Sequence, residues 1–285
     1  MATLRDIKRR ISSIAKTQQI TRAMQMVAAS RLKRAQETAI SWRAYQQRMT
    51  EVFDRLLSRT PADAHPLLAV RQPRRIELVV ITSDKGLCGG FNLNMCQKVE
   101  HFIADNRNAF EAISLSLVGR KGRDYFKRRP FPLREELGDI QRDPSSEWVR
   151  AVVTDLTERY HAEAFDVCYL CYHRFKSVLQ QTVVMERLLP FTEPEAEVQA
   201  IDYLFEPDRQ SVLDQVIPRY MESRLATALY ESTTSEYAAR MSAMDQASKN
   251  ASEMIEILTL TYNKVRQEMI TKELMDIVGG AEALQ

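Results

Sequence analysis

The first 60 residues contain neither proline nor glycine, and their apolar residues recur at alternating spacings of three and four. This spacing continues for eight heptads without interruption. It is typical of one long helix that packs along its whole length in a left-handed coiled coil. Twelve of the sixteen seam positions are apolar; the positions are Leu4, Ile7, Ile11, Ile14, Gln18, Thr21, Gln25, Ala28, Leu32, Ala35, Ala39, Trp42, Gln46, Met49, Phe53 and Leu56.

Three of the polar seam residues are neighbours: Gln18, Thr21 and Gln25. Polar residues at a coiled-coil seam often fix the register of the two helices. They also suit a helix that must contact something besides its partner helix. The sequence leaves both interpretations open.

A second long helix is predicted at the other end of the chain, because residues 219–278 also lack proline and glycine. Heptad spacing is kept there by Met244, Ala247, Ala251, Met254, Leu258, Thr261 and Val265, while the register is unclear upstream, in "ESTTSE" (231–236). The two helices are the obvious partners. They must run antiparallel, since the middle of the chain joins the end of one to the start of the other.

The predicted lengths of the two helices are unequal. The first has about 55 residues and the last about 70–75, or roughly 80 Å and 110 Å at the helical rise of 1.5 Å per residue. We therefore expect the last helix to extend beyond the first over about residues 267–285. This segment is rich in apolar side chains, and a lone helix of that kind needs a cover supplied by another chain.

Proline and glycine are concentrated between the two helices, where the pattern favours an α/β domain. Strands and helices alternate in this region, which indicates a mostly parallel sheet with crossover helices. The strand candidates are 76–82, 112–119, 165–172 and 181–189, and the helical stretches lie near 91–106, 120–128 and 146–162. The predicted organisation is a coiled-coil shaft of residues 1–60 and 208–285, an α/β domain of residues 74–195, and linkers at 61–73 and 196–207.

The cysteines and histidines give no metal or redox signature. Cys168 and Cys171 lie within an apparent strand, where positions three apart point to opposite faces, so the two thiols cannot readily share a metal or a bond. No second pair of closely spaced cysteines completes a zinc site. The four histidines form no metal-ligand spacing. We predict reduced core cysteines, no metal and no cofactor.

A glycine-rich loop, "SDKGLCGGFN" (83–92), follows the first predicted strand. In a phosphate-binding loop the lysine follows the glycines and precedes Ser or Thr, and a dinucleotide turn has GxGxxG spacing. Here Lys85 precedes the glycines, and the spacing fits neither motif. A tight strand-to-helix turn remains, as does a docking loop in which Lys85 faces an acidic partner.

The net charge of +2 conceals an uneven distribution. Residues 1–48 hold eleven Lys and Arg against two Asp and Glu, whereas residues 209–285 hold eight against eleven. A basic first helix and the stretch "GRKGRDYFKRR" (119–129) leave one alternative function open, that of a nucleic-acid-binding coiled-coil protein with an α/β domain. No run of about 18 apolar residues exists, so no membrane span is predicted.

Three long stretches carry a resemblance to a known family: "LRDIKRRISSIAKTQQITRAMQMVAASRLKRAQ" at the start, "SDKGLCGGFN" in the middle, and "AARMSAMDQASKNASEMIEILTLTYNKVRQEMITKELMDIVGGAEAL" at the end. Over essentially its whole length the chain resembles the gamma subunits of F-type ATP synthases. The resemblance implies an antiparallel coiled coil that carries a Rossmann-like α/β domain.

The resemblance also implies a function. The coiled coil would be the central shaft within a hexamer of three alpha and three beta subunits, and the α/β domain would sit with the epsilon subunit on the ring of c subunits. Proton flow would turn the ring and the shaft, while all chemistry would belong to the beta subunits. The chain would then be a non-catalytic, peripheral protein on the cytoplasmic face of a bacterial membrane, without nucleic-acid partners.

Partner-binding residues follow from the same resemblance. The loop containing Lys85 and Cys88 would face an acidic lever segment of the beta subunits, with Lys85 supplying the charge. Met24 matches a position near that lever.

At the other end of the shaft, Arg266 and Gln267 match residues that hydrogen-bond a loop of a beta subunit. Thr271 and Glu273 lie one turn further along the helix.

Overall fold

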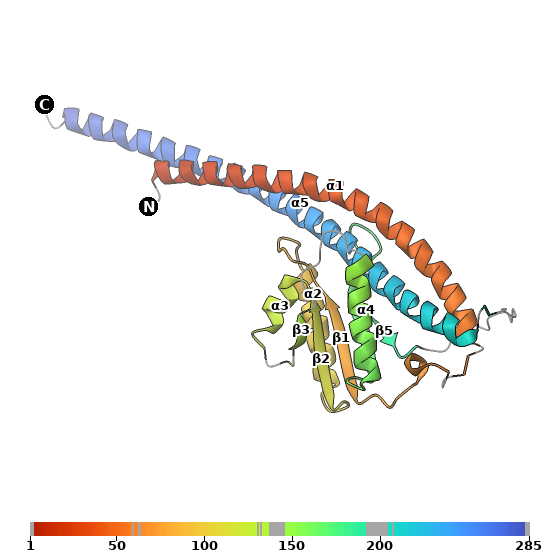
Figure 1. The fold of residues 1–285 in the computed structure, drawn as a ribbon. Helices are drawn as coiled ribbons and strands as arrows, with labels where there is room; N and C mark the ends of the chain where they lie inside the picture. Colours follow the sequence, from red (N-terminus) through yellow and green to blue (C-terminus); the bar gives the residue numbers. More distant parts are fainter. Residues whose placement is uncertain are drawn as a thin grey trace. The chain divides into compact units, whose positions relative to one another are not determined.

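The computed structural model describes residues 3–58, 60–61, 64–129, 131, 133–136, 146–191, 205–206 and 208–282. The elements along the chain are α1 (Leu4–Leu57), a short 3-10 helix (Pro66–Leu68), β1 (Arg75–Ile81), α2 (Phe91–Asp105), β2 (Ala112–Val118), α3 (Arg120–Phe126), β3 (Leu133–Glu136), α4 (Ser146–His161), β4 (Val167–Phe175), β5 (Gln181–Leu189) and α5 (Arg209–Glu282) (Figure 1). Two compact units are present, Met1–Ala28 with Met241–Gln285, and Ala29–Arg240. We call them the end unit and the sheet unit.

The sheet unit holds one five-stranded sheet in the order β3-β2-β1-β4-β5. Strands β1 to β4 are parallel, and β5 pairs antiparallel with β4. The predicted mostly parallel sheet is therefore confirmed, with all four predicted strands and all three predicted helices present within a few residues of their expected bounds. The fourth parallel strand, β3, was not predicted.

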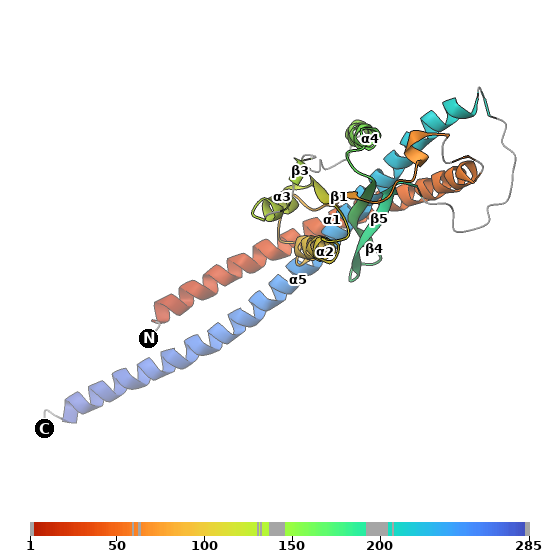
Figure 2. The same ribbon diagram turned by 90° about the horizontal axis from the view of Figure 1, so that it is seen from below.

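Helices cover both faces of the sheet, so its central strands are apolar on both sides. Figure 2 shows α2 and α4 on opposite sides of the strands. One core cluster joins Leu78 and Cys171 to α2, and the other joins Val79 and Cys168 to α4 and α5. The two strand cysteines thus point to opposite faces, as predicted. All four cysteines are free and buried, and burial raises the pKa of each thiol.

The two long helices run antiparallel in each unit, as predicted. In the sheet unit, Gln46 of α1 accepts a hydrogen bond of 2.6 Å from Ser223, while Phe53, seven residues later in α1, stacks on Tyr220. The residue numbers of the contacts therefore decrease along α5 as they increase along α1, which is the antiparallel arrangement.

In the end unit, the polar seam residues bond across the same helix pair. Gln18 donates to the Ser252 hydroxyl at 2.5 Å, and Gln25 donates to the Asp245 carboxylate at 2.9 Å. These bonds favour register control, one of the two interpretations that the sequence left open.

The predicted seam of α1 is confirmed, because all sixteen positions are buried or half-buried. The register predicted for α5 is partly wrong. Met254 is 55% exposed and Thr261 is exposed, whereas Ile255 and Tyr262 take the half-buried positions. After Ala251, the inward positions of α5 follow a step of four and then three residues, whereas the prediction had three and then four. The sequence fits both orders, because Met254 and Ile255 are both apolar and Thr261 and Tyr262 both carry a hydroxyl.

Parts of the predicted linkers are visible. Residues 61–73 include the 3-10 helix, whose Leu67 and Leu68 are buried in the same cluster as Val79. The predicted linker 196–207 lies outside the described residues except for 205–206. Among the helices that the structure describes, none combines the length and the hydrophobicity required to cross a bilayer.

Candidate functional site

The glycine-rich loop between β1 and α2 lies where an α/β sheet usually binds its ligands. It follows the carboxyl end of β1, and β1 lies between β2 and β4, where the strand order reverses. In open α/β sheets, ligands bind in the crevice outside the carboxyl ends of the strands at such a point. By its position, the loop is therefore a candidate ligand site.

Helix α5 lies at the carboxyl ends of the strands, where a ligand would otherwise bind. The Ser235 hydroxyl donates to the backbone carbonyl of His173 near the end of β4 at 3.2 Å. The Glu231 carboxylate accepts from the backbone N–H of Phe175 at 2.7 Å. Arg240 donates to the carbonyls of Lys85 and Gly86, at 3.1 and 3.2 Å. The chain's own helix thus covers the carboxyl ends of β1 and β4, which favours the docking-loop interpretation over a nucleotide site.

Internal hydrogen bonds fix the conformation of the loop. The Ser83 backbone N–H donates to the Asn92 side chain at 2.9 Å, and the Ser83 hydroxyl donates to the Lys85 carbonyl at 2.7 Å. Leu87 and Gly89 adopt positive φ angles of 63° and 57°, which is the region that glycine tolerates best. The loop is held as a defined turn.

The side chains of the loop divide into an outer and an inner set. Lys85 is exposed and Leu87 is 62% exposed, so a cation and an apolar side chain point outward. Cys88 is only 2% exposed, and its Sγ accepts from the Asn92 amide at 3.3 Å. Lys85 can meet a partner directly, whereas Cys88 supports the loop from inside and would meet a partner only through its backbone.

Arg240 binds this loop and is itself paired with Glu236; neither residue was predicted from the sequence. They form an ion pair of 2.5 Å with side chains only 12% and 17% exposed. Burial raises the pKa of Glu236, and the neighbouring Arg240 opposes that shift. The available signal was their spacing of four residues on α5, which places both on one helix face.

The end of α5 is a second candidate site, in the end unit. Four residues predicted to bind a partner are exposed here, namely Arg266, Gln267, Thr271 and Glu273. None of their side chains forms a hydrogen bond or ion pair within the described part of the chain. Apolar side chains alternate with them; Met269, Ile270, Leu274, Met275 and Ile277 are 40–68% exposed. The predicted bare, apolar overhang is present.

Met24 also belongs to the end unit, where it is half-buried beside the seam. Ile20 and Val27 lie one turn away from Met24 on the same side of α1, and both are exposed, at 60% and 51%. The structure thus places Met24 in the same unit as the α5 residues, and Lys85 and Cys88 in the other unit.

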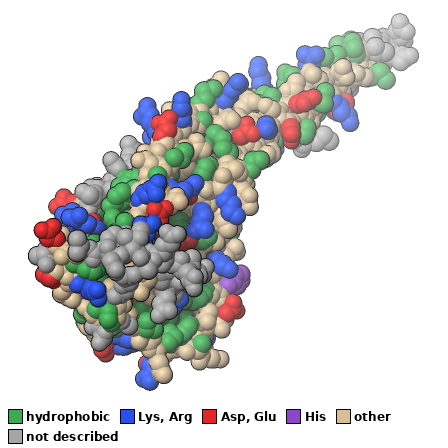
Figure 3. Space-filling view, turned by 90° about the vertical axis from the view of Figure 1, so that its right-hand side faces the viewer, with side chains coloured by type: hydrophobic (Ala, Val, Ile, Leu, Met, Phe, Trp, Pro, Cys, Tyr) green, Lys and Arg blue, Asp and Glu red, His purple; other side chains and the backbone are tan. Residues whose placement is uncertain are grey.

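The basic stretch 119–129 has structural tasks. A Cβ on Gly119 would lie 2.2 Å from the Thr82 carbonyl, and the Gly122 N–H donates to the Thr82 hydroxyl at 2.9 Å. Arg129 pairs with Glu100. In Figure 3, Lys and Arg side chains are interspersed with acidic and hydrophobic ones on the face shown. These features do not favour a nucleic-acid interface.

A metal centre is not indicated either, because no group of three or more His, Cys, Asp or Glu side chains that could hold an ion occurs among the described residues.

Comparisons with known proteins agree with these features. The ATP synthase family model matches residues 3–284. The ATP synthase gamma chain of Anaeromyxobacter sp. (strain K) is 46% identical over 290 residues, and that of Geobacter sp. (strain M21) is 43% identical over 287 residues; each alignment covers 100% of both chains.

Two solved structures are similar as well. A chain of the central stalk and c-ring structure of Tetrahymena thermophila mitochondrial ATP synthase has a TM-score of 0.63 at 28% identity, covering 80% of this chain and 99% of that chain. A chain of Euglena gracilis mitochondrial ATP synthase has a TM-score of 0.72 at 20% identity, covering 99% and 94%. The second likeness bears on the fold alone.

Proposed function

Because the chain belongs to the ATP synthase gamma-chain family, we propose that it is the central rotor stalk of an F-type ATP synthase. In this role it couples proton flow through the c-subunit ring to ATP synthesis and hydrolysis at the beta subunits by rotation. It catalyses nothing itself. Its partners are the alpha–beta hexamer, the epsilon subunit and the c ring, and it is peripheral on the cytoplasmic face of a bacterial membrane.

The exposed apolar end of α5 is the observation that carries this proposal. Five large apolar side chains between Met269 and Ile277 are 40–68% exposed on a single helix. Surface of this kind on a soluble segment marks an interaction site. An apolar sleeve that surrounds a turning helix guides it by steric contact, because rotation requires contacts that break easily. The alpha–beta hexamer supplies such a sleeve.

Polar contacts with the sleeve belong at the base of this end, at Arg266 and Gln267. We expect the double substitution Arg266→Ala/Gln267→Ala to impair cooperative ATP hydrolysis, because each lost charge-assisted hydrogen bond contributes about 1.5–3 kcal/mol. Removing residues 277–285 should mainly weaken assembly. The measurements are the ATP hydrolysis rate and the subunit composition of alpha–beta–gamma complexes that are reconstituted with each variant.

The two variants serve as controls for each other. If the truncation abolishes turnover in intact complexes while the double substitution leaves it unchanged, the roles assigned along α5 are wrong. If the chain fails to join alpha and beta subunits in any form, the proposed function itself is wrong.

Lys85 supplies a separate test of the docking loop. We propose that it faces an acidic segment of the beta subunits, so Lys85→Glu should reduce ATP-driven proton pumping while the complex remains assembled. The pair would be largely exposed, so the direct loss should be about 1 kcal/mol or less. Lys98→Glu, at an exposed position on α2, makes the same charge change outside the loop and should pump normally. Equal pumping by the two variants would contradict the role of Lys85.

A further inference from the structure

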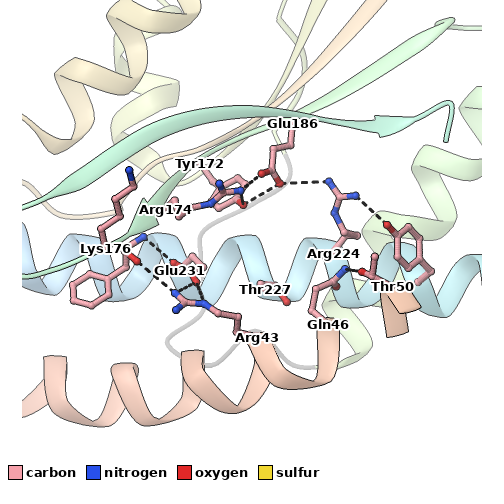
Figure 4. Close-up of a pocket in the computed structure, with 12 residues that line it drawn as sticks. Arg43, Gln46, Thr50, Tyr172, Arg174, Lys176, Glu186, Arg224, Thr227 and Glu231 are labelled. Carbon is pink, nitrogen blue, oxygen red and sulfur yellow. Dashed lines mark hydrogen bonds and ion pairs between the residues drawn. The ribbon is translucent and has the colours of Figure 1, made fainter. Parts of the chain in front are cut away.

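A cavity of about 690 Å³, lined mainly by residues with charged or polar side chains, lies in the sheet unit between α1, α5 and the β4–β5 hairpin (Figure 4). Its size falls within the range of small-molecule sites, about 300–1,000 Å³. None of the residues that line it belongs to the glycine-rich loop or to the exposed end of α5. We propose that this cavity binds a small phosphate-bearing anion, which links α1 and α5 to the sheet.

The charges around the cavity favour an anion. Four cationic side chains line it, namely Arg43, Arg174, Lys176 and Arg224, against the two carboxylates of Glu186 and Glu231. Guanidinium groups match phosphate oxygens in geometry and bind them through paired N–H donors. Three of the four cations are arginines, the residue type whose geometry matches phosphate best.

The two carboxylates orient the arginines and leave donors available. Glu231 accepts from Arg43 Nε at 2.9 Å and also from its Nη2, so the Nη1 donors of Arg43 have no acceptor among the described residues. Glu186 pairs with Arg174 through Nη2 and with Arg224 at 3.4 Å. A guanidinium has five N–H donors, and Arg174 commits only Nη2 in these contacts. The carboxylates thus hold the guanidiniums at fixed positions around the cavity.

Two further polar groups on the cavity wall, the Lys176 ammonium and the Thr227 hydroxyl, have no hydrogen-bond partner among the described residues. The Lys176 side chain is exposed, and its ammonium group forms no hydrogen bond or ion pair within the part of the chain that the structure describes. The Thr227 Oγ1 atom is buried without a hydrogen-bond partner. By contrast, Thr234 on the same helix donates to the Tyr230 carbonyl at 2.8 Å, as helix-borne threonine hydroxyls commonly do.

Helix geometry directs Thr227 toward the charged groups. Arg224, Thr227 and Glu231 are spaced by three and four residues, so they share one face of α5. In Figure 4 this face meets Arg43 of α1 on one side and the β4–β5 hairpin on the other. A hydroxyl can donate to an anionic oxygen. A bound phosphate would thus satisfy Thr227 and bring together donors from three elements.

Binding is tested on the full-length chain by titration calorimetry and thermal unfolding, at constant ionic strength in chloride. The probes are inorganic phosphate, pyrophosphate and ADP. We expect saturable binding of at least one probe and a rise in the unfolding temperature. Tighter binding of ADP than of pyrophosphate would identify a nucleoside phosphate as the ligand, and the reverse order would identify an inorganic phosphate.

Two variants locate the site. Lys176→Gln removes a charge without breaking an ion pair, and Thr227→Val removes only the hydroxyl at nearly constant volume. Each should weaken binding about tenfold, as expected for the loss of one good hydrogen bond to an anion. Thr227→Val should not lower the unfolding temperature in the absence of ligand, because its hydroxyl has no partner to lose.

Lys98→Gln on α2 is the matched control and should bind like the unmodified chain. The proposal is overturned if no probe binds more tightly than chloride at equal ionic strength. It is also overturned if the three variants bind equally well, since the anion would then lie elsewhere.

Discussion

Replacing Arg240 by methionine should lower the free energy of unfolding by about 3–5 kcal/mol, the usual cost of removing one partner of a buried ion pair. The Glu236 carboxylate, with only 17% of its side chain exposed, would lose its counter-ion. The carbonyls of Lys85 and Gly86 would each lose an N–H donor. Methionine retains the apolar stem, so the loss reports on the charged group. The measurement is urea unfolding of the full-length chain.

A local effect should accompany the loss of stability. Arg240 joins the glycine-rich loop to α5 through two hydrogen bonds, so amide hydrogen exchange across residues 83–90 should accelerate in the variant. In the assembled synthase, a loosened loop should also transmit rotation less effectively, and ATP-driven proton pumping should fall relative to ATP hydrolysis.

Lys249→Met is the matched control, because Lys249 also pairs with an acidic residue four positions earlier on α5, Asp245. That pair is exposed, and exposed pairs contribute little, so its loss should leave stability almost unchanged. The double variant Glu236→Leu/Arg240→Met should recover part of the lost stability, since no buried charge then lacks a partner. Equal effects of Arg240→Met and Lys249→Met would show that burial of the pair has no energetic consequence.

The long helices were predictable because their signals are local and repeated. The expected lengths of about 55 and 70–75 residues agree with 54 and 74, since absence of proline and glycine acts over many turns. The register of α5 against α1 was harder to predict. Met254 and Ile255 are adjacent and both apolar, so periodicity alone could not decide which one faces the partner helix.

The features that the sequence did not predict depend on tertiary contacts. Strand β3 has four residues, "LREE", with no apolar run, and it exists because β2 offers it a parallel edge. Glu77 lies in the apolar β1 segment and is fully buried. Its carboxylate accepts from the hydroxyls of Ser114 and Ser116. Those partners lie almost 40 residues away and become neighbours only through strand pairing.

The candidate site was, like the fold, predictable only in part. The glycine spacing excluded the known phosphate-binding motifs, and the unequal helix lengths predicted the exposed end of α5. The contact of α5 with the carboxyl ends of β1 and β4 was not predictable, because Ser235 and Arg240 bond to residues more than 60 positions away in sequence. The partner contacts of Met24, Lys85, Cys88, Arg266, Gln267, Thr271 and Glu273 stay predictions.

His173 should make the sheet unit sensitive to acid. Its side chain is 2% exposed and stacks on Phe91 with ring centroids 4.0 Å apart. Neither ring nitrogen has a hydrogen-bond partner among the described residues. Burial lowers the pKa of His173 from 6.5 to about 4, because the charged form loses its hydration without gaining a partner.

The sign of the pH dependence follows from proton linkage. Below pH 6.5 the unfolded chain binds a proton at His173 that the folded chain does not bind, so stability falls as the pH decreases from 6.5 to about 4. Below pH 4 both states are protonated and this loss stops. A pKa difference of this size lowers the free energy of unfolding by about 3 kcal/mol over this pH range.

Substitution by phenylalanine isolates this contribution. His173→Phe keeps a ring to stack on Phe91 and cannot take up a proton. We expect its free energy of unfolding, measured in urea at pH values between 7 and 4, to fall by about 3 kcal/mol less than that of the unmodified chain. Carboxylates titrate in both proteins and cancel in the comparison. His101→Phe, at an exposed position on α2, should follow the unmodified chain. Parallel pH curves for His173→Phe and the unmodified chain would mean that His173 is protonated equally in the folded and unfolded states, and hence that its buried ring is open to water.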